Sequence, residues 1–184
     1  MKIYLIRHTT PAIPKGFIYG RTDVPLADTF NQELNTIRQK LPSDLDVVYT
    51  SPSARCTRLA GSMALEFKTD ERLYEVNFGQ WEGKSWDTVE PKALNTWMED
   101  FVNTPPPEGE SMVQMQERVL SFWQELLLQP FAKVAVVTHG GVIRLILAYI
   151  NNIPLKVSFD LKISYGDIFL IKTAFAGKLL IEHL

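Results

Sequence analysis

The chain has 184 residues, 46% of them hydrophobic and 22% charged, which is enough for one well-buried core and short for two domains. A formal net charge of −2 leaves no basic surplus to neutralise a phosphate backbone, so we expect no nucleic-acid partner. One cysteine excludes an intrachain disulfide, and no apolar run is long enough for a signal peptide or a membrane span, which together predict a cytoplasmic protein without membrane association.

The first predicted elements are a strand, a long loop and a helix. Residues 3–6 form an apolar run that is typical of a short buried strand. The stretch 11–25 contains prolines and glycines and predicts a loop. Over residues 30–41 the apolar side chains fall on one face, which predicts an amphipathic helix, and either Asp28 or Thr29 is placed to cap it.

A second strand and a second helix follow. Residues 46–50 predict the strand, and Ser51-Pro52 is expected to open the helix with a hydroxyl cap and a proline in the first turn. The apolar stripe of that helix consists of Cys56, Leu59, Ala60, Met63 and Ala64. Residues 67–69 predict a further short strand.

The segment 73–107 is rich in aromatic residues, and a loop of this length is expected to be functional or to contain helices. We predict a mostly helical stretch over 86–101. Ser111 then begins a helix through a capping box with Gln114. The buried stripe of this helix consists of Met112, Met115, Val119, Phe122 and Leu126.

The remaining predicted elements complete an alternation of strands and helices. Residues 134–137 predict a strand and 141–150 a helix. Strands over 168–172 and 179–184, joined by a turn at Gly177, predict a hairpin at the edge of the sheet. The alternation predicts an α/β fold with three layers, α/β/α, in which a mostly parallel central sheet carries an edge hairpin at the C-terminus.

Side chains of types that are able to bind phosphate follow three of the predicted strands. Arg7-His8 follows the first strand, Ser51 and Arg55 follow the second, and His139 follows the strand over 134–137. Because the carboxyl ends of parallel strands meet at one edge of a sheet, we expect these side chains to converge. A guanidinium binds phosphate oxygens bidentately, an imidazole attacks phosphorus or donates a proton, and helix starts add free N–H groups. The sequence therefore predicts a phosphate site at this edge.

Five motifs occur in a fixed order along nearly the whole chain. They are Arg7-His8, Ser51-Pro52 with Arg55, the string EVNFGQWEG over 75–83, Gly109-Glu110-Ser111, and His139-Gly140-Gly141. Together they resemble the histidine phosphatase superfamily, the group that includes cofactor-dependent phosphoglycerate mutases and many small-molecule phosphatases. The resemblance implies one histidine-phosphatase-like domain over 1–184, in which residues 76–108 are a candidate substrate-covering insertion. Whether 84–107 form a mobile lid stays open.

The resemblance also implies catalytic roles. His8 is the nucleophile and becomes phosphorylated, Arg7, Arg55 and His139 hold the phosphoryl group, and Glu75 is the proton donor. Attack on a phosphate monoester needs a neutral imidazole, charge neutralisation on the equatorial oxygens and a proton for the departing alkoxide, so the residue types agree with these roles.

The identity of the acid has alternatives. Glu82 or Glu110 could serve instead of Glu75, and we prefer Glu75 because burial near aromatic residues such as Trp81 would favour its protonated form.

The chain departs from the family pattern after the Arg-His pair, where a glycine and a glutamate are usual and Thr9 and Thr10 stand here. A positive φ at Thr9 would be strained, because β-branched residues rarely adopt it. We expect an ordinary backbone instead, with the Thr10 hydroxyl offered to phosphate. The space of the family's usual asparagine is expected to be filled by Lys15-Gly16 or by residues 19–21.

Three further residues have a plain structural alternative. By helical periodicity alone Arg55 would be as exposed as Arg58. Cys56 is either a thiol with a low pKa beside Arg55 or, more in keeping with its apolar stripe, a core residue. His183 is expected to be structural or disordered. Since the three histidines are scattered and no metal-ligand spacing stands out, we expect neither a metal nor a cofactor.

The short length favours a phosphatase over a mutase. The loop over residues 19–23 resembles that of bacterial α-ribazole phosphatases, which act late in cobalamin nucleotide-loop assembly, so the expected partner is a small-molecule phosphate ester such as α-ribazole 5'-phosphate. The alternatives are a broad-specificity phosphatase or mutase for sugar phosphates or phosphoglycerate, and a non-catalytic phosphate-binding regulatory module. The oligomeric state stays open.

Overall fold

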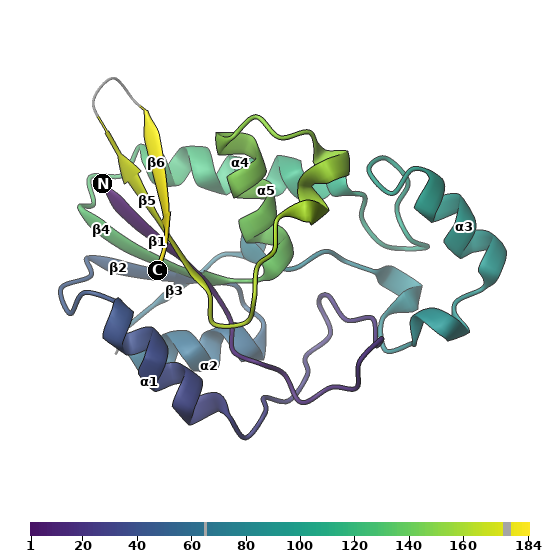
Figure 1. Ribbon diagram of the computed structural model, residues 1–184, viewed down its shortest axis with the longest axis horizontal. Helices are drawn as coiled ribbons and strands as arrows, with labels where there is room; N and C mark the ends of the chain where they lie inside the picture. The colour runs from purple at the N-terminus through teal and green to yellow at the C-terminus, as the bar shows by residue number, and fades with distance from the viewer. Residues whose placement is uncertain (65, 175–177) are drawn as a thin grey trace.

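A computed structural model describes residues 1–64, 66–174 and 178–184. Its sheet has the strand order β3-β2-β4-β1-β5-β6 (Figure 1). The strands are β1 (Lys2–Arg7), β2 (Val47–Thr50), β3 (Lys68–Thr69), β4 (Lys133–Thr138), β5 (Ile168–Thr173) and β6 (Leu179–His183). The pairs β3-β2, β2-β4 and β4-β1 are parallel, whereas β5 and β6 are antiparallel to their neighbours. The predicted mostly parallel sheet is confirmed.

Helices cover both faces of the sheet, which confirms the predicted three layers (Figure 1). The α-helices are α1 (Phe30–Lys40), α2 (Ala54–Met63), α3 (Pro91–Glu99), α4 (Met112–Leu127) and α5 (Gly140–Ile150). Helices α1 and α2 cover one face and α4 and α5 the other, while α3 stands away from the sheet. None of the helices in the described ranges is long and apolar enough to cross a bilayer.

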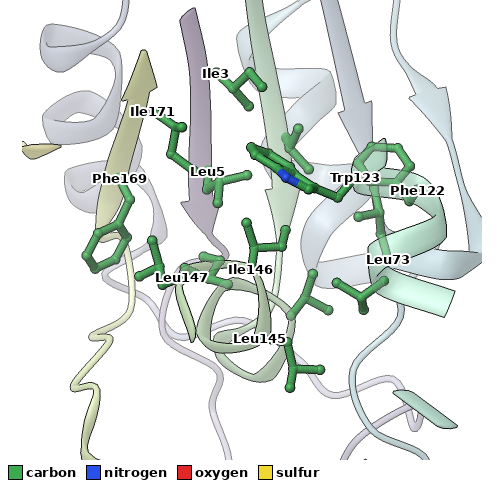
Figure 2. Packing of buried hydrophobic residues seen from close by; sticks show 14 of the residues in the cluster. Ile3, Leu5, Leu73, Phe122, Trp123, Leu145, Ile146, Leu147, Phe169 and Ile171 are labelled. Carbon is green, nitrogen blue, oxygen red and sulfur yellow. The ribbon is translucent and has the colours of Figure 1, made fainter. Parts of the chain in front are cut away.

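The alternation of side chains along β1 separates two hydrophobic cores. Ile3 and Leu5 pack toward α4 and α5, whereas Tyr4 and Ile6 pack toward α1 and α2. In Figure 2, Trp123 of α4 and the residues of α5 lie against the side chains of β1 and β5. Each fully buried aliphatic side chain contributes about 1.5–3 kcal/mol, so these two layers fix the sheet between the helix pairs.

The C-terminal hairpin lies at the edge of the sheet, as predicted, because β5 pairs with β1 and β6 pairs with β5 alone. The turn expected at Gly177 lies outside the described residues. His183 of β6 stacks on Phe169, with ring centroids 4.5 Å apart, and its Nε2 lies 3.3 Å from a carboxylate oxygen of Asp167. His183 is therefore a structural residue, which is one of the two alternatives expected for it.

One predicted helix start and one predicted capping bond differ from the structure. Helix α2 begins at Ala54 with Ser53 at the N-cap, so Ser51-Pro52 does not open it. The Ser51 hydroxyl lies instead 2.8 Å from His139 Nε2, because that side chain faces the end of β4. Thr29 is the N-cap of α1, but its hydroxyl makes no capping bond and donates to the side chain of Glu33.

The stretch over 86–101 is mostly helical, as predicted, with a short break between two helices. A 3-10 helix (Trp86–Thr88) is followed by α3, whose first residue is Pro91. Proline fits the first turn of a helix, and the Glu90 side chain caps α3 by accepting from two backbone N–H groups. Further 3-10 helices, which the sequence pattern did not indicate, are Glu71–Leu73, Gly79–Trp81 and Leu155–Asp160.

The capping box predicted for α4 is present, because Ser111 Oγ accepts from Gln114 N while Gln114 Oε1 accepts from Ser111 N. Replacing Ser111→Ala should lower the free energy of unfolding by about 1 kcal/mol, since it leaves a helix-start N–H without its partner. Urea denaturation measures this loss. Ser62→Ala, at a half-buried position of α2 whose hydroxyl caps no helix start, is the control and should cost less than about 0.5 kcal/mol. Equal losses would contradict the capping role.

Candidate active site

The three predicted strand ends meet at one edge of the sheet. In the parallel register Arg7 of β1 lies beside Thr138 of β4, and Thr50 of β2 lies beside Val137. The backbone bonds continue one residue further, since His8 N donates to Thr138 O (2.9 Å) and Ser51 N donates to Val137 O (2.9 Å). The side chains that follow the three strands are therefore held side by side.

A cavity of about 340 Å³ opens above these strand ends, which is within the size range of small-ligand sites. Its charged lining consists of Arg7, Arg55, Arg144 and Glu75, and His8 lies at its base. Aromatic side chains form much of the remaining wall: Phe17, Tyr19, Phe78, Trp86, Trp97 and Phe159. The site thus combines a cationic part with an aromatic part.

His8 presents an unprotonated nitrogen. It is 2% exposed, and its Nδ1 lies 2.8 Å from the carbonyl oxygen of Thr9. Because a carbonyl oxygen can only accept, Nδ1 carries the ring proton. Nε2 is then unprotonated, and its single lone pair accepts a hydrogen bond from Arg55 Nε at 3.3 Å.

Burial and positive charge keep both imidazoles neutral. Burial, together with the Arg55 guanidinium, lowers the pKa of His8 to about 3, although the bond to Thr9 acts in the opposite direction. Burial also holds the pKa of His139 well below its usual value, with His8 and Arg55 adding to the effect. The two rings lie 5.2 Å apart between centroids. At neutral pH His8, which lines the cavity, is therefore available as a nucleophile, whereas both ring nitrogens of His139 are occupied by contacts with Arg55 and Ser51.

Arg55 is 1% exposed, against the exposure that helical periodicity indicates. It donates to the carbonyl oxygens of Gly20 (2.5 Å) and Thr22 (3.0 Å), and to His139 Nδ1 (3.2 Å). The loop that precedes α1 covers the start of α2 and so buries this position. Arg58, three residues on, is exposed as predicted.

The covering loop needs glycine at position 20. A Cβ there would lie 1.7 Å from the carbonyl oxygen of Val76, so a side chain would push the loop away from Arg55. Of the two segments expected to fill this space, residues 19–21 do so: Tyr19 lines the cavity and Gly20 accepts from Arg55. Lys15 is exposed.

Arg7 lines the same cavity as His8 and Arg55. Its Nη1 donates to Ile163 O (2.6 Å), and its guanidinium carbon lies 3.8 Å from the centroid of the Tyr165 ring. Its Nε is buried with no hydrogen-bond partner in the described structure. Arg7 thus has donor capacity left for a ligand.

Glu75 lies where helix α5 begins. Its Oε2 accepts from Gly141 N (3.0 Å), and its Oε1 accepts from Val76 N (3.0 Å). A Cβ at position 141 would lie 2.1 Å from Oε1, so only glycine leaves room for the carboxyl group. Trp81, expected beside this acid, packs instead in a separate cluster with Ile18 and Val89.

The two alternative acids serve as structural acceptors. Glu82 accepts from Arg21 N, Thr22 N and Phe78 N. Burial raises its pKa, but the bonds from Thr22, Arg21 and Phe78 outweigh that and lower it overall. Neither Glu82 nor the second alternative, Glu110, lines the cavity.

Glu110 accepts from the guanidinium of Arg118, at 2.9 and 2.5 Å, and from Asn77 N at 2.8 Å. Its carboxylate is therefore held by the turn that precedes α4.

The departure after the Arg-His pair causes no backbone strain. Within the described ranges the non-glycine residues with positive φ are Glu108 and Asn152, so Thr9 has an ordinary backbone. Thr10 N donates to Glu33 Oε2 (2.9 Å), and Thr10 is not among the residues that line the cavity. The role of the Thr10 hydroxyl as a phosphate contact stays a prediction without support from this geometry.

Cys56 is a core residue. Its Sγ lies 3.6 Å from His139 Nε2, and burial raises the pKa of the thiol to about 12. The alternative of a low-pKa thiol is therefore wrong, because desolvation outweighs the nearby Arg55.

Two neighbours of the site differ from the expected role or had none. The Ser51 side chain was expected to cap a helix but contacts His139, and Tyr165 had no assigned role. Tyr165 and Tyr19, which belongs to the expected segment 19–21, come from distant loops, yet their hydroxyl oxygens lie 2.6 Å apart. Spacing relates Arg144 to the site, since it follows Gly141 by three positions on α5. Among the described residues, no group of three or more His, Cys, Asp and Glu side chains is arranged to hold a metal ion.

Known proteins share this architecture. The model of the histidine phosphatase superfamily (branch 1) matches residues 3–181. The chain is 30% identical over 164 residues to a Hydrogenobacter thermophilus protein provisionally named phosphoserine phosphatase 2, covering 84% of this chain and 81% of that protein. It is 26% identical over 176 residues to the adenosylcobalamin/alpha-ribazole phosphatase of Escherichia coli, covering 90% and 87%.

A solved structure agrees with the sequence comparisons. The alpha-ribazole phosphatase from Shigella flexneri superimposes with a TM-score of 0.90 at 21% identity, over 100% of this chain and 96% of that chain, which establishes a common fold. On the family match over residues 3–181, the chain belongs to the histidine phosphatase superfamily.

Proposed function

We propose that this protein hydrolyses phosphate monoesters of small molecules through a phosphohistidine at His8, without a metal ion. The observation that carries the proposal is the unprotonated Nε2 of His8, which lies at the base of a cavity between two arginines that make no ion pair in the described structure. A neutral imidazole is a nucleophile, and a cationic site attracts the phosphate dianion.

In the first step the Nε2 lone pair of His8 attacks phosphorus. The nitrogen–phosphorus bond forms as the bond to the ester oxygen breaks, and the leaving alkoxide takes a proton from Glu75. Arg7 and Arg55 neutralise the charge on the equatorial oxygens, and Arg55 exchanges its contact with His8 for one with phosphate. His139 donates or accepts a hydrogen bond beside the phosphoryl group.

In the second step water attacks the phosphohistidine. Glu75 is now ionised and takes a proton from the water, so that the nitrogen–phosphorus bond breaks and inorganic phosphate leaves. Each residue returns to its starting protonation state. The nucleophile, Arg7, Arg55 and the acid used in the two steps all line the cavity, whereas His139 is fully buried behind it and contacts Arg55 and Ser51.

For the leaving group, the aromatic wall favours a planar molecule such as α-ribazole, whose 5'-phosphate would be the substrate. Phe78, Trp86 and Trp97 of this wall belong to residues 76–108, which supports the proposal that this insertion covers the substrate. A second candidate is phosphoglycerate or a similar small acid, and the observation in its favour is Arg144 at the cavity wall. A binding module without turnover would keep the same contacts, and only an assay separates it from an enzyme.

Replacing His8→Ala should reduce hydrolysis of an aryl phosphate at least about a thousandfold, because the covalent step is lost. Wild-type enzyme incubated with substrate and quenched in alkali should carry a phosphoryl group on the peptide that contains His8, detected by mass spectrometry. A chelator should leave the rate unchanged. Most of the activity surviving in the variant, or complete loss of wild-type activity with the chelator, would overturn the mechanism.

Replacing Arg55→Ala should lower kcat/KM by an amount equivalent to about 2–5 kcal/mol, because a buried charge-assisted contact to phosphate is removed. Arg58→Ala is the matched control on the same helix and should change kcat/KM less than twofold, since Arg58 is exposed. Steady-state kinetics with one aryl phosphate decides this. Similar effects of the two substitutions would mean that the phosphate does not bind beside Arg55.

Replacing Glu75→Gln should impair alkyl phosphates much more than aryl phosphates, because an alkoxide needs a proton to leave and a nitrophenolate does not. The ratio of kcat/KM between one alkyl and one aryl substrate measures this selectivity. Glu82→Gln is the control, and any loss there should be equal for both substrates. If only Glu82→Gln changes the ratio, the two glutamates have exchanged roles.

A further inference from the structure

Arg144 lies in the active-site cavity but has no role in the steps above. It follows Gly141 by three positions on α5, and residues three apart share one face of a helix. Both line the cavity. With a rise of about 1.5 Å per residue, Arg144 lies about 4.5 Å further along the helix axis than Gly141, whose N–H binds Glu75. Its guanidinium also lies against Phe159 of the aromatic wall, and this wall is where the proposed leaving group binds.

The guanidinium of Arg144 lacks a partner within the described ranges. Its Nε is buried without a hydrogen bond, and no acidic side chain there lies within ion-pair distance. Its guanidinium carbon lies 4.9 Å from the centroid of the Phe159 ring, and burial lowers the pKa of the group. By contrast, the partly buried Arg118 donates to Glu110 and to three backbone carbonyl oxygens. Arg144 is half-buried, and the charge of Glu75, which raises its pKa, acts from beyond ion-pair distance. Leaving its buried Nε without a partner is unfavourable, so a ligand group is expected to complete it.

The charge of the cavity points to the nature of that group, if the proposed function holds. When Glu75 carries the proton it must donate, the charged lining residues are Arg7, Arg55 and Arg144. The transferred phosphate is a dianion and balances two of these three cations. One positive charge is left, and it lies on the side of the leaving group.

We propose that Arg144 binds a carboxylate on the leaving group, so that the substrates are phosphate monoesters of small carboxylic acids. A guanidinium binds a carboxylate bidentately. A single negative charge balances the remaining cation, whereas a second phosphate dianion would exceed it. The apolar part of the acid lies against Phe159 and the neighbouring aromatic side chains. This inference rests on the proposed function and selects between its two candidates, since α-ribazole 5'-phosphate has one acid group.

The test compares 3-phosphoglycerate with glycerol 3-phosphate, which differ in having a carboxylate or a hydroxymethyl group. For wild-type enzyme the KM should be about tenfold lower for 3-phosphoglycerate. Arg144→Gln should remove this preference by raising the KM for 3-phosphoglycerate about tenfold, with less than a twofold change for glycerol 3-phosphate. Arg144→Lys keeps the charge but cannot bind a carboxylate bidentately, so its KM for 3-phosphoglycerate should lie between those of wild type and Arg144→Gln.

Two controls separate this role from a structural one. Arg58→Gln, outside the cavity, should leave both KM values unchanged. Inhibition by inorganic vanadate, which occupies only the phosphate position, should be the same for wild type and Arg144→Gln. If Arg144→Gln does not fold, the wild-type preference and Arg144→Lys still decide.

The outcomes also distinguish this inference from the proposed function. A wild type that cleaves an aryl phosphate but shows no preference for 3-phosphoglycerate, or cleaves neither alkyl substrate, overturns the role of Arg144 and leaves the phosphatase standing. Equal KM changes for both alkyl substrates in Arg144→Gln likewise overturn it. A wild type that cleaves none of the three substrates overturns both proposals.

Discussion

A buried guanidinium, that of Arg55, and a half-buried one, that of Arg7, lie with two imidazoles at the end of the parallel strands, and no carboxylate in the described ranges forms an ion pair with either guanidinium. Burying charge in this way is unfavourable for the isolated protein. The backbone offsets part of the cost, because Arg55 donates to the carbonyl oxygens of Gly20 and Thr22 and Arg7 donates to that of Ile163. Burial, together with the remaining positive potential, keeps His8 and His139 neutral, and the positive potential makes the site attractive to a dianion.

The rest of the fold holds this arrangement in place. The register of β1, β2 and β4 brings His8, Ser51 and His139 to one edge of the sheet, and the two cores fix that register from both faces. Loops then complete the site from outside the sheet. The loop at Gly20 packs on Val76 at a distance that excludes a side chain, so that the covering loop and the start of the aromatic segment are positioned together.

Local sequence patterns predict the strands, helices and caps that depend on neighbouring residues. They do not predict positions that depend on contacts between residues distant in the sequence. Apolar alternation and capping chemistry placed the main strands, α4 and the convergence of the strand ends. The burial of Arg55 contradicts its helical position, because a loop about 35 residues away in sequence covers it. The predicted start of α2 was wrong because the Ser51 hydroxyl contacts His139 Nε2 and does not cap the helix. Tyr165 carries no motif, and only the folded cavity relates it to the site.

The account depends on a neutral His8 with its proton on Nδ1, and nuclear magnetic resonance of histidine labelled with ¹⁵N and ¹³C measures this directly. Signals of His8 are assigned by their absence in His8→Asn, and the ring nitrogens are followed from pH 8 to pH 5. The account predicts one neutral tautomer throughout, with Nδ1 protonated, because the pKa of His8 is lowered to about 3. Protonation of the ring with a midpoint near the ordinary value of about 6.5 would contradict it.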